Sequence, residues 1–243
     1  TPWQLILKLS DGDVTQGELL LPEGWTFRQL RQMLEAHPDL EPDTAGLSEA
    51  EILARIGARE TRAEGLFFPD TYLFDKRSGA LAVLQRAYAA MQARVDAAWD
   101  ERDPATPLAS PYEALILASI VEKETGRAED RGLVASVFAN RLRIGMRLQT
   151  DPTVIYGLGP AFDGRLRRSH LDTDHAWNTY TRAGLPPTPI AMPGEAALRA
   201  ALQPQQSDFL YFVARGDGSS EFSRDLAAHN RAVNKYIRNG GGG

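Results

Sequence analysis

The chain has 243 residues and a formal net charge of −5; 43% of its residues are hydrophobic and 24% are charged. These values are ordinary for a soluble globular protein with one large domain, or one domain plus a small one. The negative charge argues against a protein that binds nucleic acid through a basic surface. The sequence has no cysteine, which excludes disulfides and Cys nucleophiles, and its four histidines include only a loose His170/His175 pair. We therefore expect no metal site.

The N-terminal third alternates short elements with turns. Residues 2–10 are expected to form a short helix, and residues 14–21 have the character of a strand. After a Pro-Glu-Gly turn, Thr26 is a good N-cap for a helix over residues 26–35. A second helix is expected over residues 48–58, with a serine as its cap. This pattern predicts a small α/β unit.

An aromatic run begins at Glu64 and is centred on a rigid proline. Phe67 and Phe74 are expected to pack in the core. The other role open to such an aromatic cluster is a platform on which sugar rings stack, and Glu64, Asp70 and Tyr72 are candidates for lining a cleft.

Two helices follow. Residues 80–102 form an Ala-rich helix, and prolines break the chain before the next helix over residues 110–126. Ser110 is the expected N-cap of this second helix, and Gly126 is expected to end it in a left-handed turn. The apolar positions that follow helical spacing on one face are Ile116, Leu117, Ile120 and Val121.

Glu124 falls within that apolar face, whereas Glu122 points to another side of the helix. Burial of a carboxyl group is costly unless it is paired or protonated, and desolvation raises its pKa. An acid that keeps its proton near neutral pH suits general acid catalysis. The alternative is a helix-end acid that faces solvent or pairs with an arginine. Our candidate is Glu124, with Glu122 as the runner-up.

The next helix is expected over residues 130–142. Asn140 and Arg141 lie near its apolar face, and either side chain could reach the carboxylate of the preceding helix. An Arg contact would lower the pKa of that carboxylate and an apolar contact would raise it. Residues 158–176 are expected to be rich in loops. Their arginine cluster could contact peptide carboxylates or phosphates, but a solvated surface is the more common role of such a cluster.

Polar side chains in the two segments that follow are candidates for binding a ligand, because polar loops often do so. Gln149, Asp151 and Tyr156 are the candidates in the first segment, although its Thr and Asp residues could also cap a local helix. In the second segment, Asn178 and Tyr180 precede a run of prolines that holds the chain extended. Such a wall suits a groove for a linear polymer.

The C-terminal region begins with a helix over residues 195–202. Residues 208–214 and 220–223 are expected to form a hairpin around a Gly-Asp-Gly turn at 216–218. A helix over residues 225–238 closes the domain.

Several ordered motifs together resemble a known family. The helix over residues 110–126 resembles the glutamate helix of lytic transglycosylases. With the runs at 137–157, 178–187 and 211–214, and the aromatic run at 64–74, the sequence is similar to the MltG/YceG-type endolytic murein transglycosylases. The resemblance covers nearly the whole chain.

The resemblance implies an α+β fold in which a LysM-like subdomain precedes a larger mixed helical and sheet catalytic domain. The expected division is residues 1–61 for the partial LysM-like subdomain and its linker helix, 62–239 for the YceG-like domain, and 240–243 for a flexible glycine tail. LysM modules bind chains that contain N-acetylglucosamine. A packing subdomain without a sugar contact is the alternative.

The resemblance also implies the chemistry. Glu124 would protonate the β-1,4 bond between N-acetylmuramic acid and N-acetylglucosamine and then accept a proton from the C6 hydroxyl, which closes a 1,6-anhydro ring. This reaction requires no cofactor. The implied substrate-binding residues are Gln149, Asp151, Tyr156, Asn178, Tyr180, Asn140, Asp70 and Tyr72.

The implied setting is the bacterial cell wall. Peptidoglycan glycan strands would be the substrate and cell-wall synthases candidate partners, with no nucleic acid. The chain does not begin with Met and has no apolar run long enough to span a membrane. We expect a trimmed piece of a longer protein whose N-terminal anchor holds it at the periplasmic face of the inner membrane.

Three other functions compete with this one. A peptidoglycan-binding protein without turnover would use the same groove, and a muramidase would add water to the cleaved bond. Aminodeoxychorismate lyase, an older label for this family, needs a Schiff-base lysine and a phosphate cradle. No Gly-rich loop stands beside any of the lysines, which are Lys8, Lys76, Lys123 and Lys235.

Overall fold

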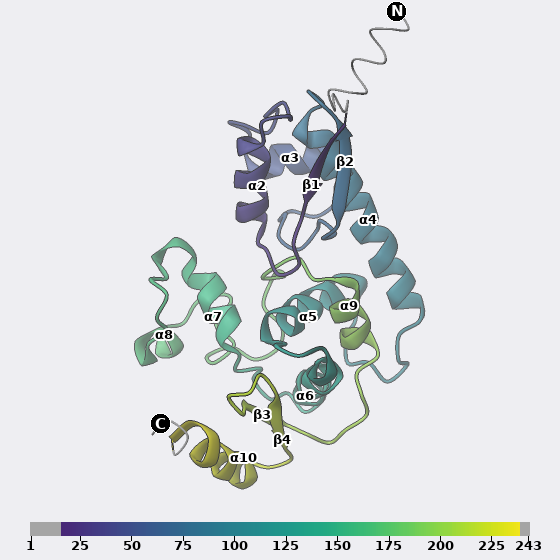
Figure 1. Cartoon of the computed structure of the whole chain (residues 1–243). Helices are drawn as coiled ribbons and strands as arrows, with labels where there is room; N and C mark the ends of the chain where they lie inside the picture. Colours follow the sequence, from purple (N-terminus) through teal and green to yellow (C-terminus); the bar gives the residue numbers. More distant parts are fainter. Residues whose placement is uncertain (1–15, 239–243) are drawn as a thin grey trace, which may run out of the picture.

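The computed structural model describes residues 16–238, so the helix expected at 2–10 and the glycine tail lie outside the described residues. An upper part with two strands rests on a lower, mainly helical part (Figure 1). The elements are β1 (Gln16–Leu20), α2 (Phe27–Ala36), α3 (Glu49–Ile56), β2 (Thr71–Asp75), α4 (Ala80–Asp100), α5 (Pro111–Glu124), α6 (Arg131–Arg143), α7 (Asp151–Leu158), α8 (Arg168–Asp172), α9 (Glu195–Leu202), β3 (Tyr211–Ala214), β4 (Ser220–Ser223) and α10 (Leu226–Val233). The arrangement confirms the α+β class. Within residues 16–238, none of the helices combines the length and hydrophobicity that a membrane crossing needs.

The upper part is built on an antiparallel pair in which Leu19 of β1 lies opposite Tyr72 of β2. One face of the pair is buried, because alternate side chains of a strand point to opposite sides. Both predicted helix starts are confirmed: Thr26 and Ser48 each form a capping box. The β2 strand comes from the aromatic run, where no strand was expected. It pairs with β1 across the division expected at residue 62, and that division stays a prediction.

In the lower part, α5 lies among α4, α6 and α9. Its side chains are buried without interruption from Ala114 to Val121, so the expectation of a single apolar face was too narrow. The N-cap at Ser110 is confirmed, since its hydroxyl accepts from the Glu113 amide. The left-handed turn at Gly126 was wrong: the helix ends at Thr125 in an extended conformation with φ −89°. Neighbouring elements surround α5, which makes it the natural support for a site.

The remaining elements lie at the margins of the lower part. α7 and α8 stand to one side of α5, and the β3–β4 hairpin with α10 lies at the lower end (Figure 1). The short helix α8 falls in a stretch that was expected to be rich in loops. The hairpin was predicted and pairs Phe212 with Phe222. Asp225 caps the last helix, which passes into a π-helical turn at Asn234–Arg238.

Backbone hydrogen bonds join the two parts next to the end of α5. The amide of Gly24 donates to the Met192 carbonyl at 2.8 Å, and the amide of Met192 donates to the Trp25 carbonyl at 2.8 Å. The ammonium of Lys123 donates to the Gly24 carbonyl at 3.2 Å. These bonds fix the last turn of α5, and with it the adjacent Glu124.

Candidate active site

Glu124 is the last residue of α5, and its side chain is half-buried. One carboxylate oxygen, Oε1, accepts a hydrogen bond from the hydroxyl of Thr150. Among the residues that the structure describes, no hydrogen bond reaches the other oxygen, Oε2. The carboxyl group therefore has one oriented oxygen and one oxygen that is available to carry a proton.

Burial raises the pKa of Glu124 above its ordinary value. The hydrogen bond from Thr150 opposes this rise, the negative charge of Asp151 adds to it, and the positive charge of Arg141 opposes it. Burial is the largest of these effects. The environment thus favours the protonated acid, as the sequence predicted from the position of Glu124 on α5.

Arg141 of α6 lies near this carboxyl group, but its guanidinium is held by backbone carbonyls. It donates to Leu148 at 2.6 Å and to Leu210 at 2.7 Å. No ion pair with Glu124 is found within residues 16–238. Arg141 therefore joins two loops and does not pair with Glu124. Of the two effects considered for this carboxylate, the rise of its pKa in an apolar environment is the larger.

Thr150 is positioned by the segment that carries Thr179. The amide of Thr150 donates to the Thr179 hydroxyl at 3.1 Å, and the amide of Gln149 donates to the Thr179 carbonyl at 3.1 Å. Thr150 is the N-cap of α7, yet its hydroxyl does not cap the helix and binds Glu124 instead. Gln149 is exposed and has φ 49°, a conformation that side chains other than glycine seldom adopt.

Asp151 and Tyr180 form the other side of this site. The Tyr180 hydroxyl donates to the Asp151 carboxylate at 2.5 Å. Burial and this bond raise the pKa of Tyr180, so its phenol stays neutral. Glu124 also contributes to that rise, which places Tyr180 in its electrostatic neighbourhood. The structure therefore brings together Glu124, Asp151 and Tyr180, which come from three separate segments.

Two predicted asparagines have roles in the fold. The amide of Asn140 donates to the carbonyls of Ser207 at 2.9 Å and Phe209 at 3.0 Å. Asn178 is fully buried, and its amide donates to the carbonyls of Leu171 and Thr173. Both side chains are occupied in fastening loops, so they support the site without facing it.

Three other candidates lie elsewhere. Tyr72 is buried and its hydroxyl donates to the Phe68 carbonyl at 2.7 Å. Asp70 accepts from the amide of Thr71 at 2.7 Å, at the start of β2. Tyr156 lies in the second half of α7 and lines a cavity that does not include Glu124. Within the described chain, none of the three forms a hydrogen bond or an ion pair with Glu124.

The runner-up, Glu122, points toward the start of α9. Its carboxylate accepts the amide of Gly194 at 3.1 Å, and Gly194 is the N-cap of α9. Burial raises the pKa of Glu122, and the Gly194 hydrogen bond opposes that rise. Its contact joins two helices, which is a structural use of the carboxylate.

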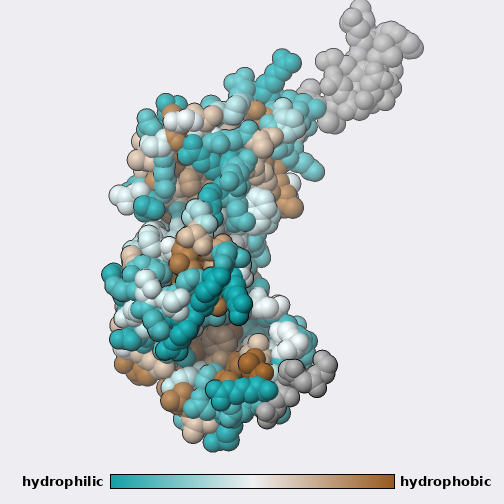
Figure 2. Space-filling model, turned by 90° about the vertical axis from the view of Figure 1, so that its left-hand side faces the viewer, coloured by the Kyte–Doolittle hydropathy of each residue, from teal (hydrophilic) through white to brown (hydrophobic). Residues whose placement is uncertain are grey.

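The surface is hollowed between the middle and the lower part of the molecule (Figure 2). In Figure 1, α7 and α8 lie above the level of this hollow, and the β3–β4 hairpin and α10 lie below it. The floor of the hollow is mainly hydrophobic (Figure 2).

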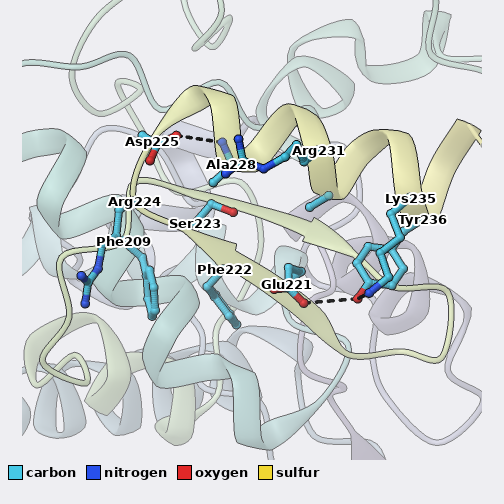
Figure 3. Close-up of a pocket in the computed structure, with 11 residues that line it drawn as sticks. Phe209, Glu221, Phe222, Ser223, Arg224, Asp225, Ala228, Arg231, Lys235 and Tyr236 are labelled. Carbon is cyan, nitrogen blue, oxygen red and sulfur yellow. Dashed lines mark hydrogen bonds between the residues drawn. The ribbon is translucent and has the colours of Figure 1, made fainter.

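A separate cavity of about 480 Å³ lies between β4 and α10 (Figure 3). Its acids are used internally: Asp225 accepts the Ala228 amide, and Glu221 accepts the Tyr236 hydroxyl. None of the candidate residues lines this cavity. Among the side chains that the structure describes, no group of three or more His, Asp or Glu residues is placed to hold a metal ion.

Thr150 and Thr179 were not predicted from the sequence as parts of the site, and Arg141 was not among the candidate site residues. The signal for Thr150 was its place at a helix start, which normally implies a local capping role. Nothing in the spacing of Thr179 indicates that it pairs with a segment far away in the sequence. Contacts between segments determine both roles.

This arrangement places one desolvated carboxyl group on an α+β scaffold, which makes Glu124 the candidate for general acid–base chemistry. The profile of the YceG-like family matches residues 1–235, and the chain belongs to that family. The endolytic murein transglycosylase of Bacillus subtilis is 38% identical over 174 residues, which cover 72% of this chain and 48% of the relative. The enzyme of the same name from Streptococcus pneumoniae (strain D39) is 28% identical over 246 residues, 90% of this chain and 44% of the relative.

The crystal structure of a yceG-like protein from Listeria monocytogenes is similar to this fold. The TM-score is 0.73 and the identity 32%, with 94% of this chain and 80% of that chain covered. The chain spans about half the length of the two curated relatives.

Proposed function

We propose that this chain carries the catalytic region of an endolytic peptidoglycan lytic transglycosylase with Glu124 as its general acid and base. It cleaves the β-1,4 bond between N-acetylmuramic acid and N-acetylglucosamine and leaves a 1,6-anhydro end. The observation that carries the proposal is the carboxyl group of Glu124, whose pKa is raised by burial and whose Oε1 is held by Thr150. The names of the relatives support the substrate.

The reaction proceeds in two proton transfers. Protonated Glu124 donates its proton to the glycosidic oxygen as the bond to C1 of the muramic acid breaks, and positive charge develops at C1. The carboxylate formed in this way accepts the proton of the C6 hydroxyl as that oxygen bonds to C1. Glu124 ends protonated as it began, and no water is consumed. One acid with a raised pKa suits both steps.

The neighbouring residues have separate roles in this scheme. Thr150 orients the carboxyl group, and the charge of Asp151 helps to keep the proton on it. Gln149 is exposed beside them and is the candidate contact for a sugar hydroxyl or acetamido group. Tyr180 fixes Asp151 through its 2.5 Å hydrogen bond.

The cellular setting belongs to the same proposal. Action on peptidoglycan implies a place outside the cytoplasm. We propose that the chain works at the periplasmic face of the inner membrane and is held there by an anchor. Cell-wall synthases are the candidate partners. The strand–turn–helix of β1 and α2 supports a LysM-like role for the upper part.

Defined glycan strands test the proposal. The strands are incubated with wild type and with Glu124→Gln, and mass spectrometry of the new ends follows. We expect ends 18 mass units lighter than hydrolysed ends from wild type only, since an anhydro end differs from a reducing end by one water. Wild type that leaves every strand intact would exclude turnover and favour the non-catalytic binding protein.

A hydrolase is the second candidate, and Asp151 is the observation that favours it. Hydrolytic glycosidases use two carboxylates across the bond, and Asp151 is a second carboxylate close enough to influence Glu124. Cleavage in ¹⁸O water separates the two enzymes. Incorporation of ¹⁸O into the new ends supports hydrolysis, and ends without the label support the transglycosylase.

A further inference from the structure

A large cavity lies where the upper part meets α7, and it is distinct from the surroundings of Glu124. We call it the junction cavity. Its volume is about 1020 Å³, and α2, α7 and the loop after α7 supply most of its lining. A smaller cavity of about 260 Å³ adjoins it and shares Arg28, Arg62, Glu64 and Tyr156 with it. The combined space can hold a ligand of several residues or sugars.

The junction cavity begins beside the proposed catalytic residues. Lys123 and Pro152 line it, and they adjoin Glu124 and Asp151 in the sequence. Successive residues of a helix point about 100° apart, so Lys123 faces the cavity from a different side of α5 than Glu124 does. The cavity is thus lateral to the cleavage site, where a branch of a polymer would reach.

The lining of the cavity is cationic although the chain is acidic overall. Arg28 is exposed on α2 and has no ion pair within residues 16–238. Arg62 approaches Glu49 at 3.5 Å, and both side chains remain partly exposed. Among the described residues, the ammonium of Lys123 forms one hydrogen bond, to the Gly24 carbonyl. Arg28 and Lys123 are therefore available to a negatively charged ligand. Arg62 shares its charge with Glu49, which lines the adjoining cavity.

The one acid of the junction cavity is already engaged. Glu64 is 6% exposed and accepts the amide of Phe27 at 3.0 Å. Burial raises the pKa of Glu64 to about 7, so part of the population is neutral near physiological pH. Glu64 therefore offsets little of the positive charge of Arg28, Arg62 and Lys123.

The rest of the lining combines apolar rings with amide side chains. Tyr156 and Trp177 meet edge to face at 5.6 Å. Gln29 and Gln32 extend from α2 at the opposite side. Aromatic rings pack against aliphatic side chains, and amide groups can bind a peptide backbone. Cations, amides and rings together match a peptide that carries carboxylates better than they match uncharged sugars.

We propose that the junction cavity binds the stem peptide of the peptidoglycan strand that is cut at Glu124, with Arg28, Arg62 and Lys123 facing its carboxylates. This inference rests on the proposed function for the identity of the polymer. The peptide branches from the lactyl group of the muramic acid. The site therefore recognises strands that still carry their peptides.

Arg28 offers a clean test because it lies in the first turn of α2. Arg28→Glu reverses its charge, and a carboxylate is favourable at that end of a helix, so the fold is retained. Arg28→Ala is the milder variant. Arg55→Ala is the matched control, since Arg55 is an exposed helical arginine that lines neither cavity.

The first measurement compares kcat and KM on strands that bear stem peptides with those on strands of equal length stripped by an amidase. The amidase hydrolyses the amide between the lactyl group and the peptide, so stripped strands carry a free lactyl carboxylate close to the sugar and lack the carboxylates of the peptide. A difference between the two substrates therefore reports on the peptide beyond the lactyl group. Arg28→Ala should raise KM for peptide-bearing strands about fivefold, the upper range for an exposed charge pair, and Arg28→Glu should raise it further. KM for stripped strands and kcat for both should stay unchanged, as should all values for Arg55→Ala.

Two outcomes would overturn the inference. An equal rise of KM for both substrates would mean that the cavity holds sugar. Unchanged KM in both Arg28 variants would mean that the peptide does not enter it.

A binding measurement separates this inference from the proposed function. Calorimetry follows a soluble N-acetylmuramyl tetrapeptide binding to Glu124→Gln, with and without Arg28→Glu, at low and high salt. Weaker binding in the double variant, with a smaller salt dependence, supports the junction cavity even if wild type cuts no strand. Equal binding by both proteins contradicts the inference even if wild type forms anhydro ends.

Discussion

In two regions of the molecule, burial raises the pKa of a carboxyl group, and the two regions use that group differently. Around Glu64, a backbone amide of α2 binds the carboxylate, and the side chain is 6% exposed. Around Glu124, a threonine hydroxyl binds one oxygen, and the side chain is half-buried. Burial raises the pKa of both groups. A raised pKa alone therefore does not identify a catalytic acid.

The ends of the two helices explain the contrast. Glu64 lies at the N-terminus of α2, where it satisfies the free amide of Phe27 and meets the positive end of the helix dipole. Glu124 lies at the C-terminus of α5, where the dipole disfavours a negative charge. The first carboxylate joins two segments of the fold. The carboxyl group of Glu124 lies where a negative charge is unfavourable. Such a place favours the protonated form, which a general acid needs.

The largest expected effect is that of Glu124→Gln. The amide keeps the shape of the side chain but cannot donate a proton to the glycosidic oxygen. We expect the rate of anhydro-end release to fall by roughly 10²- to 10⁴-fold, the range for loss of a general acid, with the unfolding midpoint retained. Mass spectrometry of strand ends measures the rate, and thermal unfolding measures the fold.

Glu122→Gln is the matched control on the same helix turn. Its side chain can still accept the Gly194 amide, so release should stay within a few-fold of wild type. The assignment of Glu124 would be reversed if Glu122→Gln lost the activity and Glu124→Gln kept it.

The next effect concerns stability and separates Glu64 from Glu124. The folded-state pKa of Glu64, about 7, exceeds its ordinary value, so the folded protein binds the proton more tightly than the unfolded chain. Stability from this group is fully present below the unfolded pKa and is lost as pH rises toward 7. The loss is about 3 kcal/mol in the free energy of unfolding.

Glu64→Gln should remove this dependence, so the variant should exceed wild type in stability at pH 8 and match it more closely near pH 4.5. Urea unfolding at both pH values measures the difference. Glu18→Gln, at an exposed carboxyl group on β1, should behave as wild type. A Glu64→Gln protein as pH-dependent as wild type would place the titration elsewhere.

Local signals in the sequence predicted most of the fold. Thr26, Ser48, Ser110 and Asp225 each cap a helix within three residues, so their roles are legible without tertiary structure. The β2 strand was missed because a strand in an aromatic run is recognisable only through its partner. The left-handed turn at Gly126 failed because Thr125 ends the helix first.

The site was predictable where one helix determines it. Glu124 followed from helical spacing, whereas its partner Thr150 belongs to another segment 26 residues away. Asn140 and Asn178 were predicted to bind substrate, but their amides bind backbone carbonyls of the fold. Both are polar and lie in the right segments, but an amide that fastens backbone carbonyls looks the same in a sequence as one that binds a sugar.

The smallest expected effect comes from a pair of substitutions beside Glu124, read in the pH dependence of kcat. The first proton transfer needs the protonated acid, so the rate falls as pH rises through the pKa of Glu124. Thr150→Val removes a hydrogen bond that lowers this pKa, so the alkaline limb should move to higher pH. Asp151→Asn removes a charge that raises it, so the limb should move to lower pH.

Each displacement should be about one pH unit or less, since a single neighbouring group is changed in each variant. Release of anhydro ends between pH 4 and pH 9, at constant ionic strength, locates the limb. The opposite directions are the decisive feature, because a general loss of activity would lower both profiles without moving them apart. Displacements in the same direction would assign the proton to a group other than Glu124. The catalytic acid to be contrasted with Glu64 would then be a different residue.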